Sequence, residues 1–579
     1  MCPLALIVHW CSCRNGAASF VFRKLLIIAT LLLLTIAIFA VAAGSALSAP
    51  VGEQVTGASE KVYTPRAYGA RCDGSTDDTK AIQAAITGAI ATHGTVQLCS
   101  GTALIAPPTP AQVFHLRGGN LRITGCGMGC SVLKLKNGAG DFNTIFGPEA
   151  AMSNVTLDNF TVDYNSTNNH PKSLAKFRAL VFWATGNNIT LDKLDVTDID
   201  AVNVVYAGET HTTVTHSRFA LNTGGKYYHD SSVLYLVGEG AIAEGNYFVG
   251  APNAAGSVTA IETHAGGQTI TGNVIDGFEV CANLTGINAS GDSEGTVFAN
   301  NVCKNGLIGA DLWSRAYGDH KSGKGIHSFS VTGNTFDIHQ HLWHINPSSG
   351  GALSAPAGIS IDSGATLPIS NLLIANNNIS FDLSSSGSDP YSNSNGAIAY
   401  WDQSGRNSVS DIMITGNQVT NSPSAGLYWN AGCDGCNFSG NSFINCGSNL
   451  NPKMNSYVRA GITIVTQEPV DIALENEVIT DNLATTRMVR GIYLGGAAKS
   501  AITVGARINV SGSNSSAYLY PVDVGANSAP FLSITNVAPA MGAKLPPHRV
   551  APSSIIYDIP TGFNYTTKDG RSWEKTSQP

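Results

Sequence analysis

A short phrase that recurs through the middle of the chain constrains the fold more than any other feature. Two alternating apolar residues lead to a glycine or polar residue, then an asparagine, then a second apolar pair. The asparagines of the eight copies are Asn246, Asn273, Asn301, Asn334, Asn377, Asn417, Asn441 and Asn476. Successive copies lie 24 to 43 residues apart. A fixed core with loops of different length is typical of a repeating coil.

A second strand pattern falls between these phrases and usually opens with glycine. It alternates valine, isoleucine, threonine and aromatic residues with period two, which predicts short strands without a helical period. The opening glycines are Gly309, Gly358, Gly396, Gly426, Gly461 and Gly491. Together the two patterns predict an all-β parallel solenoid with ladders of apolar side chains inside. Asparagine tolerates the left-handed backbone of the bend, and its amide can bond from coil to coil.

Repetition also decides the domain organisation. At about 150 residues per domain, 579 residues would give roughly four domains, whereas stacked coils give one. We expect the solenoid over residues 62–500, followed by terminal strands and an irregular tail over 501–579.

The first coil of a solenoid must be covered, and residues 76–92 predict the helix that covers it. Either Thr76 or Asp77 can cap the helix N-terminus. Ile82, Ile86 and Ile90 recur every four residues and give the helix one apolar face.

The start of the chain predicts export. Residues 25–43 carry no charge and follow two basic residues, an arrangement typical of an export signal. The segment is also long enough to span a membrane, so residues 1–49 are either a cleaved signal peptide or a retained signal anchor. Residues 50–61 form a linker in either case. We expect the rest of the chain to be secreted or extracytoplasmic, with membrane contact only through residues 25–43.

Nine of the 12 cysteines follow that segment, and an oxidising compartment allows them to pair. The predicted bridges are Cys72–Cys99, Cys126–Cys130 and Cys281–Cys303. Cys433, Cys436 and Cys446 then leave one cysteine over. A zinc site at Cys433 and Cys436 would need a second ligand pair that the sequence lacks.

The charge balance argues against one class of partner. The chain has 33 basic and 40 acidic residues, a net charge of −7 and no run of lysine or arginine. Nucleic-acid binding needs such a basic surface, so we expect no nucleic-acid partner. The lack of a wide basic groove also argues mildly against a strongly polyanionic substrate.

Residues 62–105 resemble the opening of the pectate-lyase-like superfamily. The matching elements are Tyr68-Gly69-Ala70, Asp73-Gly74, Thr76-Asp77-Asp78-Thr79, Ala81-Ile82-Gln83 and Gly94-Thr95-Val96. The resemblance implies a single-stranded right-handed parallel β-helix in a family of polygalacturonase-like and glucanase-like hydrolases, lyases and phage tailspikes. Cys99 and Ala103 depart from the family pattern, which has proline and an aromatic residue there. The catalytic phrases of polygalacturonases and of alginate epimerases are absent, which disfavours a plain polygalacturonase.

Candidate site residues come from the outward positions of the strands. Alternate residues of a strand face away from the core. If the apolar residues point inward, the outward set is Glu262, His264, Asp311, Trp313, Asp362, Tyr428 and Asn430. Carboxylates and aromatic rings therefore gather on one side of the predicted solenoid.

This outward set predicts an exported glycoside hydrolase that cleaves an extended polysaccharide. Coils ~4.8 Å apart put Asp362 about one coil from Asp311, and Glu262 about two coils, ~9.6 Å, from Asp311. Carboxyl groups ~5–5.5 Å apart retain the sugar configuration and groups ~6.5–9.5 Å apart invert it. Both spacings are available on this face, and we favour inversion. We assign Asp311 as the general acid, its protonated form favoured by the charge of Asp362, and Glu262 or Asp362 as the base. The predicted substrate-binding residues are His264, Trp313, Arg315, Tyr428 and Asn430.

Two other classes of function remain open. A polysaccharide lyase needs a base and a neutraliser for an acidic sugar, which the segment after Trp313 can supply from Arg315, His320, Lys321, Lys324 and His327. A non-catalytic glycan-binding or adhesion protein would use the same face, because any exposed sheet face carries some acidic residues and tyrosines.

No cofactor is predicted, although a site for calcium or a transition metal remains an alternative. Asp337, His339 and His341 would share one face of an extended strand, and His344 follows. Oxygen and nitrogen ligands of this kind suit a metal. A loop that lines a groove without a metal is the commoner explanation of such a cluster.

Overall fold

The computed structural model of the chain describes residues 61–576 apart from 150–151, 173–175, 184–185, 209, 225–227, 229, 286–292, 315–324, 350–354, 364–367, 383–395, 403–407, 449–457, 467, 469, 484–487, 497–500, 511–519, 525–530, 539–554, 559–562 and 567–573. The predicted export segment at 25–43 lies outside these residues. Among the residues described, no helix is long and apolar enough to cross a membrane.

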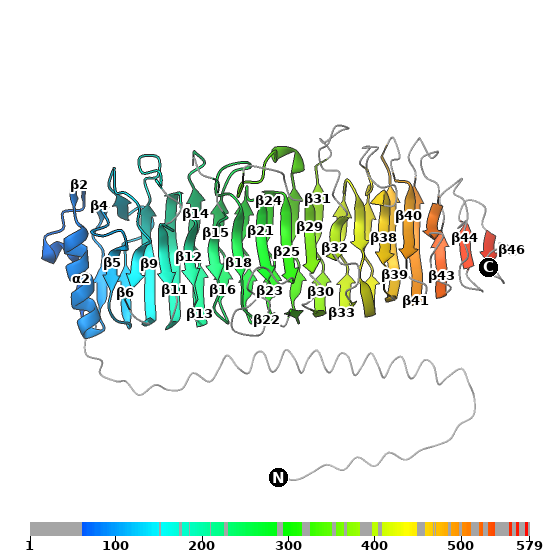
Figure 1. The fold of residues 1–579 in the computed structure, drawn as a ribbon, viewed down its shortest axis with the longest axis horizontal. Coiled ribbons are helices and arrows are strands. Elements are labelled where there is room, and N and C mark those ends of the chain that lie inside the picture. The colour runs from blue at the N-terminus through cyan, green and yellow to red at the C-terminus, as the bar shows by residue number, and fades with distance from the viewer. Residues whose placement is uncertain are drawn as a thin grey trace, which may run out of the picture. The chain divides into compact units, whose positions relative to one another are not determined.

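Parallel strands stack coil upon coil along one axis (Figure 1). One column is a sheet of 14 parallel strands, called sheet B here. Its strands in spatial order are β5 (Gln112–Leu116), β8 (Thr144–Pro148), β10 (Ala179–Trp183), β12 (Asn203–Ala207), β15 (Ser232–Leu236), β18 (Thr259–Thr263), β21 (Val280–Thr285), β25 (Ile308–Ser314), β29 (Ala357–Ser363), β32 (Gly396–Asp402), β35 (Ala425–Trp429), β38 (Ala460–Thr466), β40 (Arg490–Gly496) and β42 (Tyr520–Val524).

The remaining strands form the other hydrogen-bonded network, sheet A, and most coils give it two strands on either side of a bend. These strands are β1 (Val62–Tyr63), β2 (Asp73–Asp77), β3 (Thr95–Gln97), β4 (Gly101–Ile105), β6 (Leu121–Thr124), β7 (Ser131–Leu135), β9 (Met152–Asp163), β11 (Gly186–Ile199), β13 (Thr210–Thr215), β14 (Arg218–Leu221), β16 (Ile242–Glu244), β17 (Tyr247–Val249), β19 (Thr269–Thr271), β20 (Val274–Asp276), β22 (Ser293–Glu294), β23 (Val297–Ala299), β24 (Val302–Gly306), β26 (Ile326–His327), β27 (Ser330–Thr332), β28 (Thr335–Ile338), β30 (Ile369–Ala375), β31 (Asn378–Phe381), β33 (Ser408–Thr415), β34 (Gln418–Thr420), β36 (Gly432–Ser439), β37 (Ser442–Ile444), β39 (Val470–Asp481), β41 (Ala501–Val510), β43 (Phe531–Ala538), β44 (Ile555–Asp558), β45 (Phe563–Thr566) and β46 (Glu574–Thr576). Stacking continues past residue 500, because β41 pairs in parallel with both β39 and β43.

The core consists of ladders of identical or similar side chains, one rung per coil. In sheet B, Ala310 pairs with Ile359, which pairs with Ile398, and all three are fully buried. In sheet A, Phe219 pairs with Phe248, and their rings stack with centroids 5.4 Å apart. The predicted all-β parallel solenoid with an apolar interior is therefore confirmed.

A helix, α2 (Thr79–Thr92), lies at the N-terminal end of the stack (Figure 1). Ile82, Ala85, Ile86 and Ala89 are buried on it, while Ile90 is half-buried. A short 3₁₀ helix, η1 (Pro65–Tyr68), precedes it.

The predicted N-cap of that helix is wrong by one or two residues. The residue at the N-cap position is Asp78, and its carboxylate turns back to accept the N–H groups of Arg71 and Cys72 at 2.8 and 2.9 Å. Asp77 instead accepts the N–H and hydroxyl of Thr79 at 3.1 and 2.7 Å. Both carboxylates are used in holding the start of the helix.

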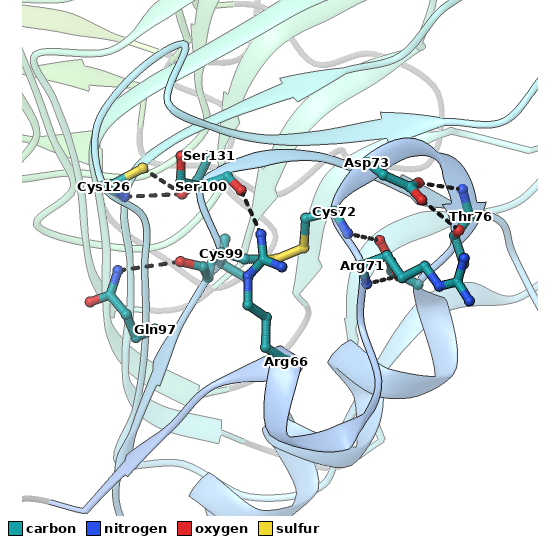
Figure 2. Close-up of a disulfide and its surroundings, with 12 residues drawn as sticks. Arg66, Arg71, Cys72, Asp73, Thr76, Gln97, Cys99, Ser100, Cys126 and Ser131 are labelled. Atoms are coloured by element: carbon teal, nitrogen blue, oxygen red, sulfur yellow. Dashed lines mark hydrogen bonds between the residues drawn. A yellow bond between two sulfur atoms is a disulfide. The ribbon is translucent and has the colours of Figure 1, made fainter.

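All three predicted disulfides are present, and Cys433 pairs with Cys436, which leaves Cys446 buried and unbridged among the described cysteines. Figure 2 shows the Cys72–Cys99 bridge, which ties the segment before α2 to Cys99, two residues after β3. The departure from the family pattern at Cys99 therefore has a structural reason.

The repeated asparagines form one continuous buried ladder. The backbone N–H and the Nδ2 atom of each residue both donate to the Oδ1 atom of the asparagine in the next coil. Asn417, for example, receives two bonds of 3.0 and 2.9 Å from Asn377 and gives two of the same lengths to Asn441. Its Nδ2 atom also donates to the carbonyl oxygen of Ile374 at 2.9 Å. Seven predicted positions, Asn246 to Asn441, lie in this ladder and are about 1% exposed or less.

Two details of the predicted ladder are wrong. The residue with the left-handed backbone is the one before each ladder asparagine, such as Gly416 or Asn376. One residue therefore forms the bend, and the next one makes the hydrogen bonds of the ladder. The eighth position is also shifted by one residue. Asn476 is the left-handed residue of its coil, and the buried Glu477 accepts the N–H and Nδ2 of Asn441 at 3.0 and 2.9 Å.

Glu477 ends the ladder because the next coil places Ala506 opposite it. Burial raises the pKa of the Glu477 carboxyl to about 8, against the opposing effect of the two bonds from Asn441. A folded-state pKa above the unfolded value makes this group stabilising at low pH, and that contribution is lost as the pH rises toward about 8.

Replacing a ladder residue should destabilise the fold strongly. In Asn417→Ala, buried donors and acceptors of Asn377, Asn441 and Ile374 lose their partners, and we expect a loss of about 2–5 kcal/mol. Urea denaturation measures this loss, with Gln418→Ala, an exposed neighbour, as the matched control. Equal midpoints for the two variants would show that the ladder adds nothing.

Replacing the end of the ladder should change how stability depends on pH. Glu477→Gln keeps one oxygen that can accept from Asn441 but has no charge to bury. We expect the stability of the variant relative to the parent to increase from pH 5 to pH 8, since in this range only the parent must take up a proton at residue 477 when it folds. Denaturation midpoints at both pH values test this, and Glu475→Gln, two residues away and exposed, should show no such gain.

Candidate functional site

The outer face of sheet B carries a column of polar side chains, one per coil. Strand register aligns Glu262 with Asn283, Asn283 with Asp311, and Asp311 with Ser360. Two residues further along the strands, Thr285 aligns with Trp313 and Trp313 with Asp362. Burial alternates as predicted: Ala310 and Leu312 are buried, while Asp311 and Trp313 are partly exposed. This set of aligned residues is called the outer column below.

The spacing of the three predicted catalytic carboxylates differs in part from the expectation. Glu262 and Asp311 are two coils apart, about 9.6 Å between Cα atoms, as predicted. Asp362 lies one coil beyond Asp311 but pairs with Trp313, so it is also displaced two residues along the strand. The Cα atoms of Asp311 and Asp362 are therefore about 8 Å apart rather than one strand spacing. The sequence could not show this because it does not fix the register.

Glu262 is held by two neighbours. The hydroxyl of Ser232, on the preceding coil, donates a short hydrogen bond to Oε2, and the Nε2 atom of His264 lies 2.8 Å from Oε1. The side chains of Glu262 and His264 are 14% and 18% exposed, so both reach the surface. These two contacts fix the orientation of the Glu262 carboxyl group.

Aromatic rings continue the outer column on its N-terminal side. Tyr206 and Tyr235 lie 5.1 Å apart between ring centroids, and Tyr235 lies 4.9 Å from the ring of His264. Burial raises the pKa of the Tyr235 phenol well above its ordinary value, and the charge of Glu262 adds to the shift. Tyr235 therefore stays protonated and can donate a hydrogen bond over the whole neutral range.

Three predicted substrate-binding residues lie elsewhere or differ in their surroundings. Tyr428 is on the outer face, but only 4% exposed, and it packs with Ala399 and Val458 in a cluster separate from the core. Its ring does not form an open stacking platform. Asn430 follows β35 and is partly exposed. Arg315 lies outside the described residues.

The basic groups considered for a lyase are mostly outside the described residues as well. Of that set only His327 is described, and it lies on β26 in sheet A, with Nδ1 2.7 Å from the hydroxyl of Ser370. Strands β12 to β38 of sheet B contain no lysine or arginine. The strand surface around the outer column is therefore neutral to acidic.

Two residues of the site were missed from the sequence. Ser232 comes at the start of β15 and looks like an ordinary strand residue. Asn283 lies midway between Glu262 and Asp311, and its buried Oδ1 receives no hydrogen bond from the described residues. Strand β21 does not open with glycine, so the repeat pattern did not reveal it. Counting ten residues on from the ladder asparagines Asn273 and Asn301 reaches Asn283 and Asp311, so the ladder spacing could have found Asn283.

The predicted metal-binding cluster lies outside the outer column. Asp337 is on β28 in sheet A, and His339 and His341 follow that strand. The described group that could hold a metal is His339, His341 and Asp382, without Asp337 or His344.

Comparison with known proteins extends the resemblance seen at the N-terminus. Residues 65–311 match the family model described as rhamnogalacturonase A/epimerase, pectate lyase-like. The mannuronan C5-epimerase AlgE3 of Azotobacter vinelandii is 31% identical over 147 residues, which are 24% of this chain and 8% of the relative. AlgE2 of the same organism is 32% identical over 146 residues, 24% of this chain and 14% of the relative. The match thus spans a small part of these epimerases.

One solved structure covers most of both chains. A mutant tailspike protein of E. coli bacteriophage HK620, in complex with a pentasaccharide, superposes with a TM-score of 0.55 at 13% identity, covering 82% of this chain and 80% of that one. This likeness concerns the fold. Together with the family model it confirms the predicted resemblance to the pectate-lyase-like superfamily.

Proposed function

Because this chain resembles the pectate-lyase-like parallel β-helix proteins, we propose that it binds an extended polysaccharide along the outer column and hydrolyses it with inversion of configuration. The observation that carries the proposal is that Glu262, Asp311 and Asp362 lie on one outer face over four successive coils, with Trp313 on the strand of Asp311 and paired with Asp362. Separations of about 8 to 9.6 Å between Cα atoms suit inversion, which needs room for a water molecule, better than retention.

The surroundings of each carboxyl group suggest its role. Glu262, bonded by Ser232 and His264, is the base that activates the water molecule. Asp311 is the acid that protonates the leaving oxygen, and Asp362 favours its protonated form. Trp313 supplies a ring against which a sugar can pack, and Asn283 a side-chain amide between acid and base. We infer a neutral glycan, since the strands of this face carry no lysine or arginine to pair with a polyuronate.

A second candidate is proton abstraction from an acidic sugar, as in a lyase or an epimerase. The contact of Tyr235 with His264, beside Glu262, is the observation that favours it, because a phenol and an imidazole are groups that can give a proton to the sugar or take one from it. The matched part of the relatives, which are named as mannuronan C5-epimerases, points the same way. The acidic to neutral strand surface is the argument that ranks it second.

We propose that the protein acts outside the cytoplasm. The four disulfides among the described residues support this, since such bridges persist in oxidising compartments. The apolar segment at residues 25–43 is the export signal in this proposal, either cleaved or kept as an anchor.

Removing the acid or the base should abolish turnover without unfolding the protein. On a panel of neutral and uronic-acid glycans, Asp311→Asn and Glu262→Gln should each lower kcat roughly 10²–10⁴-fold. Asp434→Asn, which changes an exposed carboxylate on sheet A, should leave kcat unchanged. Full activity in Asp311→Asn would remove the assignment of the acid.

The products should distinguish the reactions. Nuclear magnetic resonance of the first products should show the inverted anomer. Substrate binding is tested separately by Trp313→Ala, which should raise KM about 3–10-fold because the packing of a sugar against the ring is lost. Unsaturated products that absorb ultraviolet light would identify a lyase, and epimerised but uncleaved chains an epimerase. Glycan binding without any product would identify a binding protein.

A further inference from the structure

A second group of chemically active side chains lies beside sheet A. His339, His341 and Asp382 each offer one ligand atom, and these atoms all lie within 4.8 Å of one another. The Nδ1 atom of His341 makes a close ion pair with Oδ2 of Asp382. We propose that these three side chains bind a divalent transition-metal ion of the zinc type.

The fold brings the three residues together although the chain separates them. Strands β28 and β31 are parallel neighbours, with Ile338 paired with Phe381. Asp382 follows directly, and its N–H donates to the carbonyl oxygen of Ile338 at 3.2 Å. His339 and Asp382 therefore leave the sheet side by side on adjacent coils. His341 reaches the same place from the 3₁₀ helix η2 (Gln340–Leu342).

Asp337 orients a ligand rather than acting as one. Its Oδ2 atom lies 3.0 Å from Nε2 of His339, and the hydroxyl of Ser380 donates to its Oδ1 atom at 3.3 Å. A carboxylate on one ring nitrogen fixes the imidazole orientation and makes the other nitrogen a better metal ligand. His339 is thus held with Nδ1 as the atom for the metal.

The segment after His339 is anchored at several points. Trp343 is fully buried, and its Nε1 donates to the carbonyl oxygen of Asn305 at 3.1 Å. Asn253, from another coil, accepts the N–H of His344 at 2.7 Å and donates to the carbonyl oxygen of Leu342 at 2.6 Å. Ligands on an anchored segment lose little freedom when a metal binds, which favours affinity.

The donor set selects the class of metal. Two imidazole nitrogens and one carboxylate oxygen suit zinc and similar ions, with a further position left for water. Calcium prefers six to eight oxygen ligands, which this cluster does not offer. Tetrahedral ligands at zinc distances stand about 3.4 Å apart, so donors within 4.8 Å converge through small side-chain rotations. Without a metal, the ion pair between His341 and Asp382 would add little to the stability of the fold, because His341 is exposed.

Zinc binding to the full chain tests the site. The purified protein is stripped with a chelator, titrated with Zn²⁺ by calorimetry and analysed for bound zinc. The parent should bind one more equivalent than His339→Ala, His341→Ala or Asp382→Ala. Other histidines and cysteines of the chain can also bind Zn²⁺. The difference in bound zinc between the parent and each variant therefore counts only the ion held by this cluster. His344→Ala, on the same segment but outside the cluster, is the matched control.

Two further measurements keep the proposal testable if a ligand variant folds poorly. Asp337→Asn retains all three ligands and should weaken zinc binding roughly 10–100-fold at unchanged stoichiometry. Saturating Zn²⁺ should raise the melting temperature of the parent and of His344→Ala more than that of Asp337→Asn. Equal zinc affinity in the parent and Asp337→Asn, or a site that takes Ca²⁺ but not Zn²⁺, would overturn the proposal.

Discussion

Hydrogen bonding from one coil to the next is the constraint on which the rest of the structure depends. A coil cannot satisfy its own strand N–H and C=O groups, so each needs a neighbour on both sides. The buried asparagines extend this requirement to side chains, because each Oδ1 atom accepts two bonds from the coil before it. The ladder therefore fixes the position of every bend relative to the next.

A ladder with one direction needs a beginning and an end. At the start, the N–H of Ser217 donates to Asn246, while the Ser217 hydroxyl accepts from Leu194 and donates to Thr215. At the end, both carboxyl oxygens of Glu477 accept from Asn441, and Ala506 follows. The amide donors of the ladder all point toward Glu477, and their hydrogen bonds lower the pKa of its carboxyl group. Burial raises that pKa and is the larger effect, so the pKa is raised overall.

Periodic features were predictable from the sequence, and features that depend on register were not. The solenoid and seven ladder asparagines follow from repeated spacing and alternation, and three disulfides were predicted from the export of the chain to an oxidising compartment. Glu477 was missed because Asn476 beside it fitted the repeated phrase. A carboxylate can accept the two hydrogen bonds from Asn441 but cannot donate to a further coil, so it can replace an amide only at the end of the ladder. Asn283 and Asp382 enter their clusters through pairing with coils distant in the sequence. Tyr428 points outward as predicted, but residues distant in the sequence, such as Val458, pack against it.

The same register limits the chemistry that a face of this kind can perform. Residues on a sheet face can be separated only by whole coils and by even numbers of residues along a strand, so carboxyl spacings come in steps. One coil gives about 4.8 Å, one coil with a two-residue shift about 8 Å, and two coils about 9.6 Å between Cα atoms. The first spacing lies near that of retaining glycosidases and the others near that of inverting ones. The proposed acid and base, Asp311 and Glu262, lie two coils apart, which places them with the inverting enzymes. Asp362 stands opposite Trp313 rather than Asp311, so it also lies farther from Asp311 than one strand spacing. The register of β18, β25 and β29 therefore leaves none of these three residues at the one-coil spacing that retention would use.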